Sequence, residues 1–324
     1  MVQVVLRLKK TDVVKLLEEL MEGDTAGDPM GKGKIWTRRS TRTLKKECGD
    51  RGVSVCATTV SKLLKDMDYS LRVNRKTIAE TRHPDRNRQF EIINETKKYF
   101  EDSGQPIISV DSKKKELIGN FRNEGKAWTK IVNEVLAHDF RSQAIGVGCP
   151  FGIYELLTNL GTVIVGTSYD TPEFAVESIK IWLDEFGWKR YPCAKELLIL
   201  CDAGGSNGFR PRLWKYALYQ NICKVYGLSI RICHYPSGAS KWNPVEHRLF
   251  SFISKNWEGN PLRSYDVMLS LIAGTTTTAG LLVQTILNEK EYQKGIKITD
   301  DQMKEININK HSVLPDWNYT ISLN

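Results

Sequence analysis

The sequence predicts an α/β fold, a mixed sheet flanked by helices, preceded by an N-terminal all-α helix-turn-helix module. Two observations support this. Between residues 106 and 255, short apolar runs of strand length alternate with longer segments of helical periodicity. Before residue 100 the apolar residues recur at helical spacing, and the positive charge of the chain is concentrated there. The chain therefore contains a basic helical part and a larger α/β part.

The composition is that of a folded protein with one large core. The chain has 324 residues, of which 41% are hydrophobic. No apolar run approaches the ~18 residues that span a bilayer, and the first ten residues lack the apolar region of a signal peptide. The seven cysteines form no Cys-x-x-Cys pair, which favours reduced thiols over a zinc site. We expect a cytoplasmic protein with no membrane partner.

Positive charge is concentrated in one segment of the chain. Residues 31–90 contain 16 Lys and Arg against 6 Asp and Glu, a net charge of +10, whereas the whole chain carries +9. Such a segment attracts nucleic acid through the release of counterions. The alternative is a solvated charged surface without a partner.

The basic segment also has the pattern of a helix-turn-helix. A helix over 13–21 precedes a glycine-rich linker over 23–33, and helices over 40–48 and 58–67 enclose a turn with two glycines at 49–52. The second of these would be the recognition helix, although many helical hairpins bind nothing. The predicted DNA-contacting residues are Thr58, Thr59, Ser61, Lys62 and Lys65, followed by Arg72, Arg75 and Lys76 in a basic tail.

The remaining elements follow in order. A helical connector over 85–101 leads into the alternating region. There the sequence predicts a strand over 106–111, a hairpin of 151–157 with 162–167, a helix over 171–186, a strand over 196–202, a helix over 213–226, a strand over 228–234 and a helix over 244–255. The expected domains are an N-terminal helix and linker (1–33), the helix-turn-helix module with its connector (34–100), the α/β domain (101–262) and a C-terminal helical extension and tail (263–324).

Three acidic residues occupy positions suited to metal-dependent chemistry. Asp111 and Asp202 each end an apolar strand, and Glu246 lies in the first turn of the helix after the last strand. Buried carboxylates are costly unless they are paired or bind a cation, and three that converge suit Mg²⁺ or Mn²⁺. Two such ions, about 4 Å apart, can activate the attacking oxygen and stabilise the leaving oxygen in phosphodiester chemistry.

Each acid also has a purely structural explanation. Asp111 and Asp202 can begin turns, since Asp202–Gly208 (DAGGSNG) is rich in turn residues. Glu246 can belong to a capping box in which Asn243 is the N-cap and Pro244 the first helical residue. The ordered strand, strand and helix positions favour a joint role for the three acids.

Several segments resemble a known family. The motifs at 109–120 (SVDSKKKELIGN), 202–208 (DAGGSNG) and 240–253 (SKWNPVEHRLFSFI) closely resemble the Rhodopirellula-type DDE transposases, an insertion-sequence family distantly related to the mariner group. The resemblance covers nearly the whole chain. It includes the segments 27–30 (GDPM), 58–64 (TTVSKLL), 170–176 (DTPEFAV) and 317–321 (WNYTI).

The resemblance implies a ribonuclease H-like fold with a catalytic, metal-binding triad at Asp111, Asp202 and Glu246. It implies metal-dependent cleavage at transposon ends and strand transfer into target DNA, with two Mg²⁺ or Mn²⁺ ions. The partner would be double-stranded DNA, bound by a homodimer or larger assembly near the bacterial nucleoid. The alternatives are a catalytically inactive, transposase-derived DNA-binding protein and a ribonuclease H-like nuclease without strand transfer.

Residues near the triad are expected to contact DNA. Lys113, Lys115 and Lys241 would hold phosphates, and Trp242 would stack on an extruded base. A solvated charge run and an aromatic residue packed before a helix are the alternatives. The resemblance also implies that relatives carry another helix-turn-helix ahead of the segment matching 7–30, so we expect a shortened form with weakened recognition of DNA ends.

Overall fold

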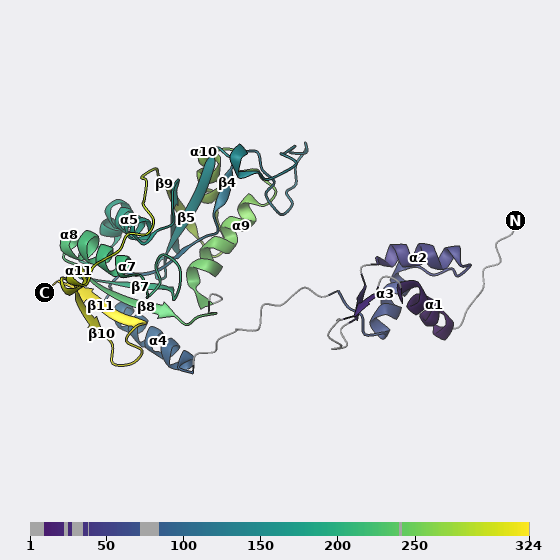
Figure 1. Cartoon of the computed structure of the whole chain (residues 1–324), viewed down its shortest axis with the longest axis horizontal. Helices are drawn as coiled ribbons and strands as arrows, with labels where there is room; N and C mark the ends of the chain where they lie inside the picture. Colours follow the sequence, from purple (N-terminus) through teal and green to yellow (C-terminus); the bar gives the residue numbers. More distant parts are fainter. Residues whose placement is uncertain are drawn as a thin grey trace. The chain divides into compact units, whose positions relative to one another are not determined.

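The computed structural model describes residues 10–22, 25–27, 35–37, 39–71, 84–239 and 242–323. The chain divides into two units, residues 1–78 and residues 79–324 (Figure 1). Within its described residues, the smaller unit holds three helices and a two-stranded ribbon. The larger unit holds the mixed sheet, and the three acids lie in it.

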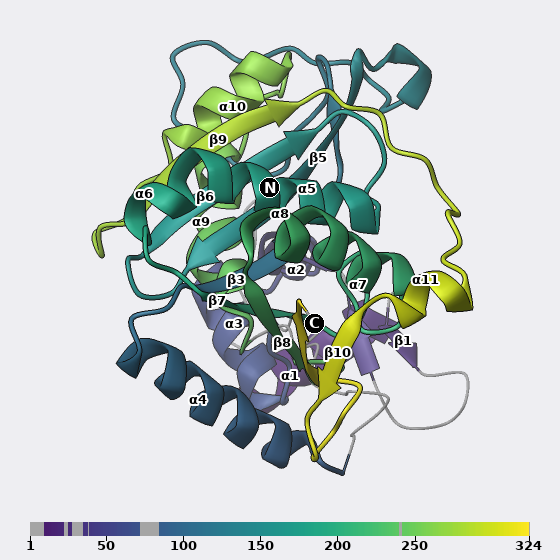
Figure 2. The ribbon, with the colours of Figure 1, turned by 90° about the vertical axis from the view of Figure 1, so that its left-hand side faces the viewer.

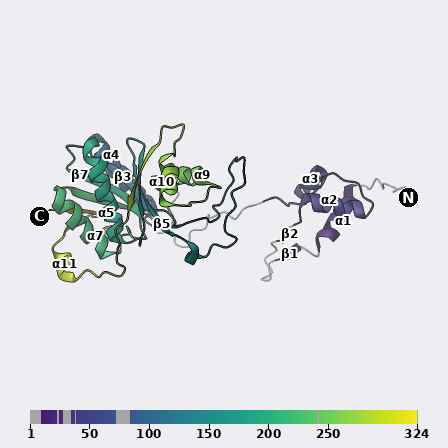
Figure 3. The same ribbon diagram turned by 90° about the horizontal axis from the view of Figure 1, so that it is seen from above.

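The three helices of the smaller unit share one core. They are α1 (Lys10–Glu22), α2 (Thr41–Asp50) and α3 (Ala57–Asp66), which lie together in Figures 1 and 3. Their apolar faces bury Leu17, Leu44 and Val60 completely. Burial of such side chains, rather than helix propensity alone, stabilises short helices in water.

Local capping sets the start of α2 and of α3. Ser40 Oγ accepts a hydrogen bond from the backbone N–H of Thr43 at 3.1 Å. In the same way, Cys56 Sγ accepts a hydrogen bond from the backbone N–H of Thr59 at 3.3 Å. Gly52, at φ +80, reverses the chain between the two helices, a backbone conformation that L side chains rarely adopt. The two expected helices are therefore present, joined by the expected glycine turn.

The smaller unit is not all-α, which corrects the expectation. β1 (Thr25–Gly27) pairs antiparallel with β2 (Ile35–Thr37) across the segment expected to be a plain linker. An isoleucine, a tryptophan and a threonine in succession form a typical strand sequence. The glycine-rich composition around them concealed this short pairing.

The larger unit is built on a mixed sheet, which confirms the predicted class. Within the described residues it has nine strands, in the order β10-β11-β8-β7-β3-β5-β6-β9, with β4 paired on β5. The strands are β3 (Ile107–Ser112), β4 (Glu116–Ile118), β5 (Gly146–Glu155), β6 (Leu160–Gly166), β7 (Glu196–Asp202), β8 (Ser229–Tyr235), β9 (Leu282–Asn288), β10 (Asn307–Lys310) and β11 (Asn318–Ser322).

Burial on both faces accounts for the apolar sequence of the central strand β7. It pairs in parallel with β3 on one side and with β8 on the other. Residues 197–201 are fully buried, because helices cover both faces of the sheet there. A strand with no exposed face has no place for alternating polar residues.

Helices cover both faces of the sheet, as Figure 2 shows for α5, α7 and α8 in front of the strands. The first face packs against the core of α5 and α7. The second packs against α4 at the β7–β8 end and against α9 and α10 over β5 and β6. Among the described residues no helix is long and apolar enough to cross a membrane. The helices are α4 (Arg86–Asp102), α5 (Pro172–Trp182), α6 (Trp188–Arg190), α7 (Arg212–Leu218), α8 (Lys224–Tyr226), α9 (Ser251–Trp257) and α10 (Tyr265–Ala273), with a 3₁₀ turn η1 (Arg141–Gln143).

Three of these helices contain a π-helical turn. The segment η2 (Leu183–Gly187) joins α5 to α6, η3 (Tyr219–Cys223) joins α7 to α8, and η5 (Glu246–Phe250) leads into α9. Each π turn adds a residue and rotates the side chains that follow it, and such turns are frequent at functional sites. Glu246 is the first residue of η5.

The C-terminal part corrects a second expectation. Residues 263–324 are not a helical extension, because β9 pairs in parallel with β6 at one edge of the sheet while β11 pairs with β8 near the other. β-Branched residues recur in both segments, and the neighbouring strands supply their hydrogen-bond partners. Similarly, α4 packs on β3 and β8 and lies in the larger unit, not in the basic module.

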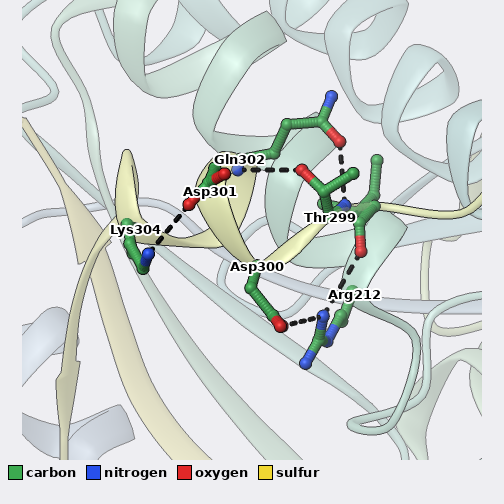
Figure 4. Close-up of polar contacts among 7 residues, drawn as sticks. Arg212, Thr299, Asp300, Asp301, Gln302 and Lys304 are labelled. Atoms are coloured by element: carbon green, nitrogen blue, oxygen red, sulfur yellow. Dashed lines mark hydrogen bonds and ion pairs between the residues drawn. The ribbon is translucent and has the colours of Figure 1, made fainter.

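A short helix secures the segment between β9 and β10. α11 (Asp300–Lys304) begins with a capping box between Thr299 and Gln302. Arg212, the first residue of α7, donates to Asp300 at 2.6 Å and to the Ile298 carbonyl at 3.3 Å (Figure 4). Both charged side chains are largely exposed, so this contact orients the segment more than it stabilises it.

A glycine allows η5 to lie close to the sheet, which gives the first prediction. A methyl group on Gly152 would lie 2.5 Å from Phe250 and 3.0 Å from Val245. We expect Gly152→Ala to lower the free energy of unfolding by about 1–3 kcal/mol through overpacking, measured by denaturant titration of the full chain. Gly204→Ala, where a methyl group meets nothing within 4 Å, is the control. Equal stability of the two variants would contradict this packing.

Candidate active site

Two of the acids lie at matching ends of neighbouring strands. In the parallel pair β3 and β7, Val110 is opposite Cys201, and Asp111 and Asp202 are the next residue on each strand. Val110 and Cys201 face the core of α5 and α7. Because side chains alternate along a strand, both acids face the opposite side of the sheet.

The third acid reaches this place on a helix that packs over the same face. Val245, just before Glu246, and Phe250, about one turn after it, are buried against Gly152. Gly152 is the residue of β5 that pairs with Asp111 of β3. Glu246 itself is half-buried. The missing side chain at Gly152 therefore allows the Glu246 helix to approach the end of β3.

A buried carboxamide connects these elements. Asn243 Nδ2 donates to Asp202 Oδ1 at 3.0 Å, and Asn243 Oδ1 accepts from Ser109 Oγ at 2.5 Å. Ser109 and Asn243 are fully buried. The Asn243 side chain therefore does not form the alternative capping box, and the backbone N–H of Glu246 bonds to the backbone carbonyl of Asn243 at 3.2 Å.

The glycine-rich loop after Asp202 closes on β3. Asn207, also buried, donates from Nδ2 to the Val110 carbonyl at 3.3 Å. A methyl group on Gly208 would lie 2.8 Å from the Ala203 carbonyl oxygen, so this tight loop requires glycine there. Ser206 Oγ is buried without a hydrogen-bond partner. Asn207 thus shapes the loop, whereas the Asp202 carboxylate is held by Asn243.

Burial and neighbouring negative charge raise the pKa values of Asp111 and Asp202. Burial raises the pKa of Asp111 to about 8, and the negative charges of Asp202 and Glu246 add to the rise. A hydrogen bond from the Ser112 backbone N–H, at 2.8 Å, partly opposes it. Burial also raises the pKa of Asp202, against the hydrogen bond from Asn243. The site therefore disfavours full ionisation of its carboxyl groups, and a bound cation would stabilise their ionised forms.

His234 lies behind the site, not in it. Its Nδ1 is 3.0 Å from the Asp202 backbone carbonyl, and its Nε2 is 3.1 Å from the Tyr319 hydroxyl. Burial lowers the His234 pKa to about 4, so the ring is neutral at pH 7. A proton on Nδ1 suits the carbonyl acceptor, and the Tyr319 hydroxyl then donates to Nε2. His247, in contrast, is exposed on η5.

The lysines after β3 differ in their surroundings. Lys113 is only 15% exposed, and its ammonium lies 4.8 Å from the centre of the Trp257 ring and 3.6 Å from Glu116. Lys114 and Lys115 are exposed. All three line a groove of about 1000 Å³ together with residues 121–125 and the end of α9. Lys113 is thus already engaged, whereas Lys115 presents an exposed side chain to the groove.

Trp242 packs on α4, while Lys241 lies outside the described residues. The Trp242 ring is 44% exposed, lies 5.5 Å from the Phe90 ring, and carries the Arg86 guanidinium 4.6 Å above it. This contact ties the segment before η5 to α4. It leaves part of the ring accessible.

The predicted recognition helix presents the expected side chains. Thr58, Thr59, Lys62 and Lys65 are exposed on α3, Ser61 is half-buried, and Val60 and Leu63 form the buried face. Arg72, Arg75 and Lys76 lie outside the described residues.

The donor set at the acids fits a divalent cation. Carboxylate oxygens are the ligands that Mg²⁺ prefers, and such an ion would offset the burial and the repulsion that raise the pKa of Asp111. Within the described parts of the chain, however, no three His, Cys, Asp or Glu side chains already enclose a metal-sized space. Binding of a divalent cation would therefore draw the three carboxylates closer together.

Comparison with known families identifies the chain. The family model described as the Rhodopirellula transposase DDE domain matches residues 16–323. The chain belongs to this transposase family. The resemblance seen in the sequence motifs is confirmed, and the match includes both the three acids and α3. No curated protein matches the chain.

Solved structures with a similar arrangement are distant in sequence. The Mos1 transposase paired-end complex with the left transposon end is 13% identical, with a TM-score of 0.41 over 81% of this chain and 68% of that one. The mariner Mos1 paired-end complex with Mg is 15% identical, with a TM-score of 0.40 over 80% and 68%. A simian T-cell lymphotropic virus intasome, in complex with PP2A regulatory subunit B56 gamma, is 10% identical, with a TM-score of 0.29 over 64% and 66%. The family assignment therefore rests on the family model.

Sequence reasoning missed the pair Ser109 and Asn243. The signal was present, because Ser109 is the one polar residue within the apolar run Ile107–Val110. A hydroxyl at a fully buried strand position needs a partner. Which residue supplies that partner depends on a contact 134 residues away, which no local pattern contains.

The pKa of Asp111 gives a prediction on stability. The folded pKa of about 8 exceeds the ordinary value of 3.8, so the folded state holds an extra proton between these values. The contribution of Asp111 to stability is therefore lost as pH rises through this range. In the absence of metal, we expect the Tm of Asp111→Asn to exceed that of the wild type by a margin that widens between about pH 5 and pH 8.

Added Mg²⁺ should narrow this margin, since it stabilises the ionised wild-type site. Substitution of Asp301, which is 90% exposed on α11, by Asn is the matched control and should show no such trend. A margin that stays constant with pH would mean that Asp111 ionises normally in the folded protein.

Proposed function

We propose that the chain is a DNA transposase that cleaves a strand at transposon ends and joins the freed end to target DNA. Membership of the transposase family supports this proposal. The observation that carries it is the position of Asp111 and Asp202 at matching ends of β3 and β7, with Asn243 linking both strands to the Glu246 helix. In this proposal the fold is ribonuclease H-like and the three acids are the catalytic, metal-binding triad.

The proposed reaction has two phosphoryl-transfer steps at one site. In the first, water attacks a phosphorus atom at the transposon end, and the bond to the 3′ oxygen breaks to leave a 3′-hydroxyl. In the second, this hydroxyl attacks a target phosphodiester, and the 3′ oxygen of the target strand departs. Both steps exchange one P–O bond for another, so a single arrangement of carboxylates serves both.

The residues of this chain have separate tasks in the proposal. Asp111, Asp202 and Glu246 would hold two Mg²⁺ or Mn²⁺ ions, which when bound supply activation of the attacking oxygen and stabilisation of the leaving one. Asn243 holds Asp202 in place. Lys115, at the rim of the groove beside the site, would contact a DNA phosphate.

The smaller unit would bind double-stranded DNA through α3. Its exposed threonines would contact base edges, and Lys62 and Lys65 would contact phosphates, as in a helix-turn-helix. As the family resemblance implies, the assembly on DNA would be a homodimer or larger. The assignment of DNA binding to α3 rests on the charge of the segment and the form of the two helices.

Isosteric substitution of the acids tests the reaction. We expect Asp111→Asn, Asp202→Asn and Glu246→Gln each to lower cleavage of a labelled transposon-end duplex by at least about 100-fold, because each removes a metal-binding charge. DNA affinity in a binding assay should stay within about twofold, since the basic module lies in the other unit.

The variant Asp301→Asn, changed at a carboxylate that is 90% exposed on α11, should cleave normally. Cleavage without joined products would favour the nuclease alternative. A wild-type chain that binds but neither cleaves nor joins would favour the inactive DNA-binding alternative. Cleavage that survives Asp202→Asn would contradict the proposed site.

Salt dependence tests the DNA-binding assignment. Lys62→Ala and Lys65→Ala in the full chain should each weaken binding to all sequences alike and reduce the slope of log affinity against log salt by about 1. Lys98→Ala, on an exposed face of α4, is the matched control. Unchanged slopes in both α3 variants would place the DNA contacts elsewhere.

A further inference from the structure

We propose that Asn243 is a positioning residue that fixes the relative placement of all three acids through a buried relay, Ser109–Asn243–Asp202. This inference rests on the proposed function, because it assigns a role within that site. It is carried by hydrogen bonds from one side chain and its own backbone to the three elements that bear the acids.

The first contact joins the two strands. Ser109 lies two residues before Asp111 on the same face of β3, and its hydroxyl donates to Asn243 Oδ1. Asn243 Nδ2 donates in turn to Asp202 at the end of β7. The Asn243 side chain therefore bridges the two strands next to the acids that they carry.

The polarity of this relay is fixed. If the Asn243 amide were turned over, its oxygen would face the Asp202 carboxylate and its NH₂ group would lose the carboxylate as acceptor. The Ser109 hydroxyl, which must find an acceptor because it is fully buried, favours the orientation seen here. Ser109 thus orients Asn243, and Asn243 orients Asp202.

The relay occupies only one of the two oxygens of Asp202. Asn243 binds Oδ1, and among the described residues no hydrogen bond reaches Oδ2. One oxygen is thus fixed by a neutral donor, which costs the site no added positive charge. The other remains able to bind a cation.

The backbone of Asn243 sets the position of Glu246. Its carbonyl accepts from the Glu246 N–H, and Pro244 restricts the φ angle at the first helical residue. Val245 then packs against Gly152, opposite Asp111. A shift of Asn243 would therefore move the Glu246 helix as well as release Asp202.

The test measures metal binding directly, with Mn²⁺ as the probe and the metal-free full chain as the protein. Electron paramagnetic resonance of free Mn²⁺ gives the affinity. We expect Asn243→Ala to weaken Mn²⁺ binding by about 10–100-fold, the usual effect of removing a group that orients a metal ligand. Ser109→Ala should cause a smaller loss. The double variant should be no worse than Asn243→Ala, because both act through one relay.

Two further variants separate the possible outcomes. Asn288→Ala removes a buried carboxamide with two hydrogen-bond partners at the sheet edge, and it should lower the Tm without changing Mn²⁺ affinity. Asp202→Ala should abolish binding at the same site. If it does so while Asn243→Ala and Ser109→Ala, folded by circular dichroism, bind as the wild type does, the relay is wrong and the proposed site stands. If Asp202→Ala leaves Mn²⁺ binding unchanged, the proposed site itself fails.

Discussion

The parallel register of β3 and β7 is the constraint on which the candidate site depends. Pairing Val110 with Cys201 makes Asp111 and Asp202 neighbours, because each follows its partner by one residue. A slip of one residue would send one carboxylate into the apolar core of α5 and α7. The register is held by apolar residues buried on both faces, so the packing of the core and the position of the acids are set by the same interactions.

Close approach of the last helix is the second requirement. Gly152 and Gly161 lie on neighbouring strands, and a methyl group on either would lie 2.5 Å from a side chain of η5. Because these two glycines have no side chains, Phe250 and Leu249 can fill the space above the sheet. The π turn then begins at Glu246, so the acid lies at the sheet end of the helix and the apolar residues lie over the strands.

The sequence predicts the parts of this fold that local pattern determines. The strand 196–202 is found with the predicted bounds. A short apolar run that ends in a loop rich in turn residues fits few secondary structures other than a buried strand. The strands β9 and β11 are not predicted from local pattern, since their partners lie about 120 and 90 residues earlier in the chain. Asn243 illustrates the same limit at the site. Its place before Pro244 favours a helix cap, yet the buried Ser109 hydroxyl and the Asp202 carboxylate, both distant in sequence, compete successfully for its side chain.

The energetic problem of the site is that it holds three carboxylates together at the edge of an apolar core. Complete neutralisation by Lys or Arg would relieve the repulsion between the carboxylates, but it would also remove the charge that attracts a cation. The chain instead compensates in part, with neutral donors: the Ser112 backbone for Asp111 and the Asn243 amide for Asp202. The nearby cation Lys113 is turned toward Trp257 and Glu116. Burial, together with the charges of Asp202 and Glu246, therefore keeps the pKa of Asp111 raised, and a divalent ion would stabilise its ionised form.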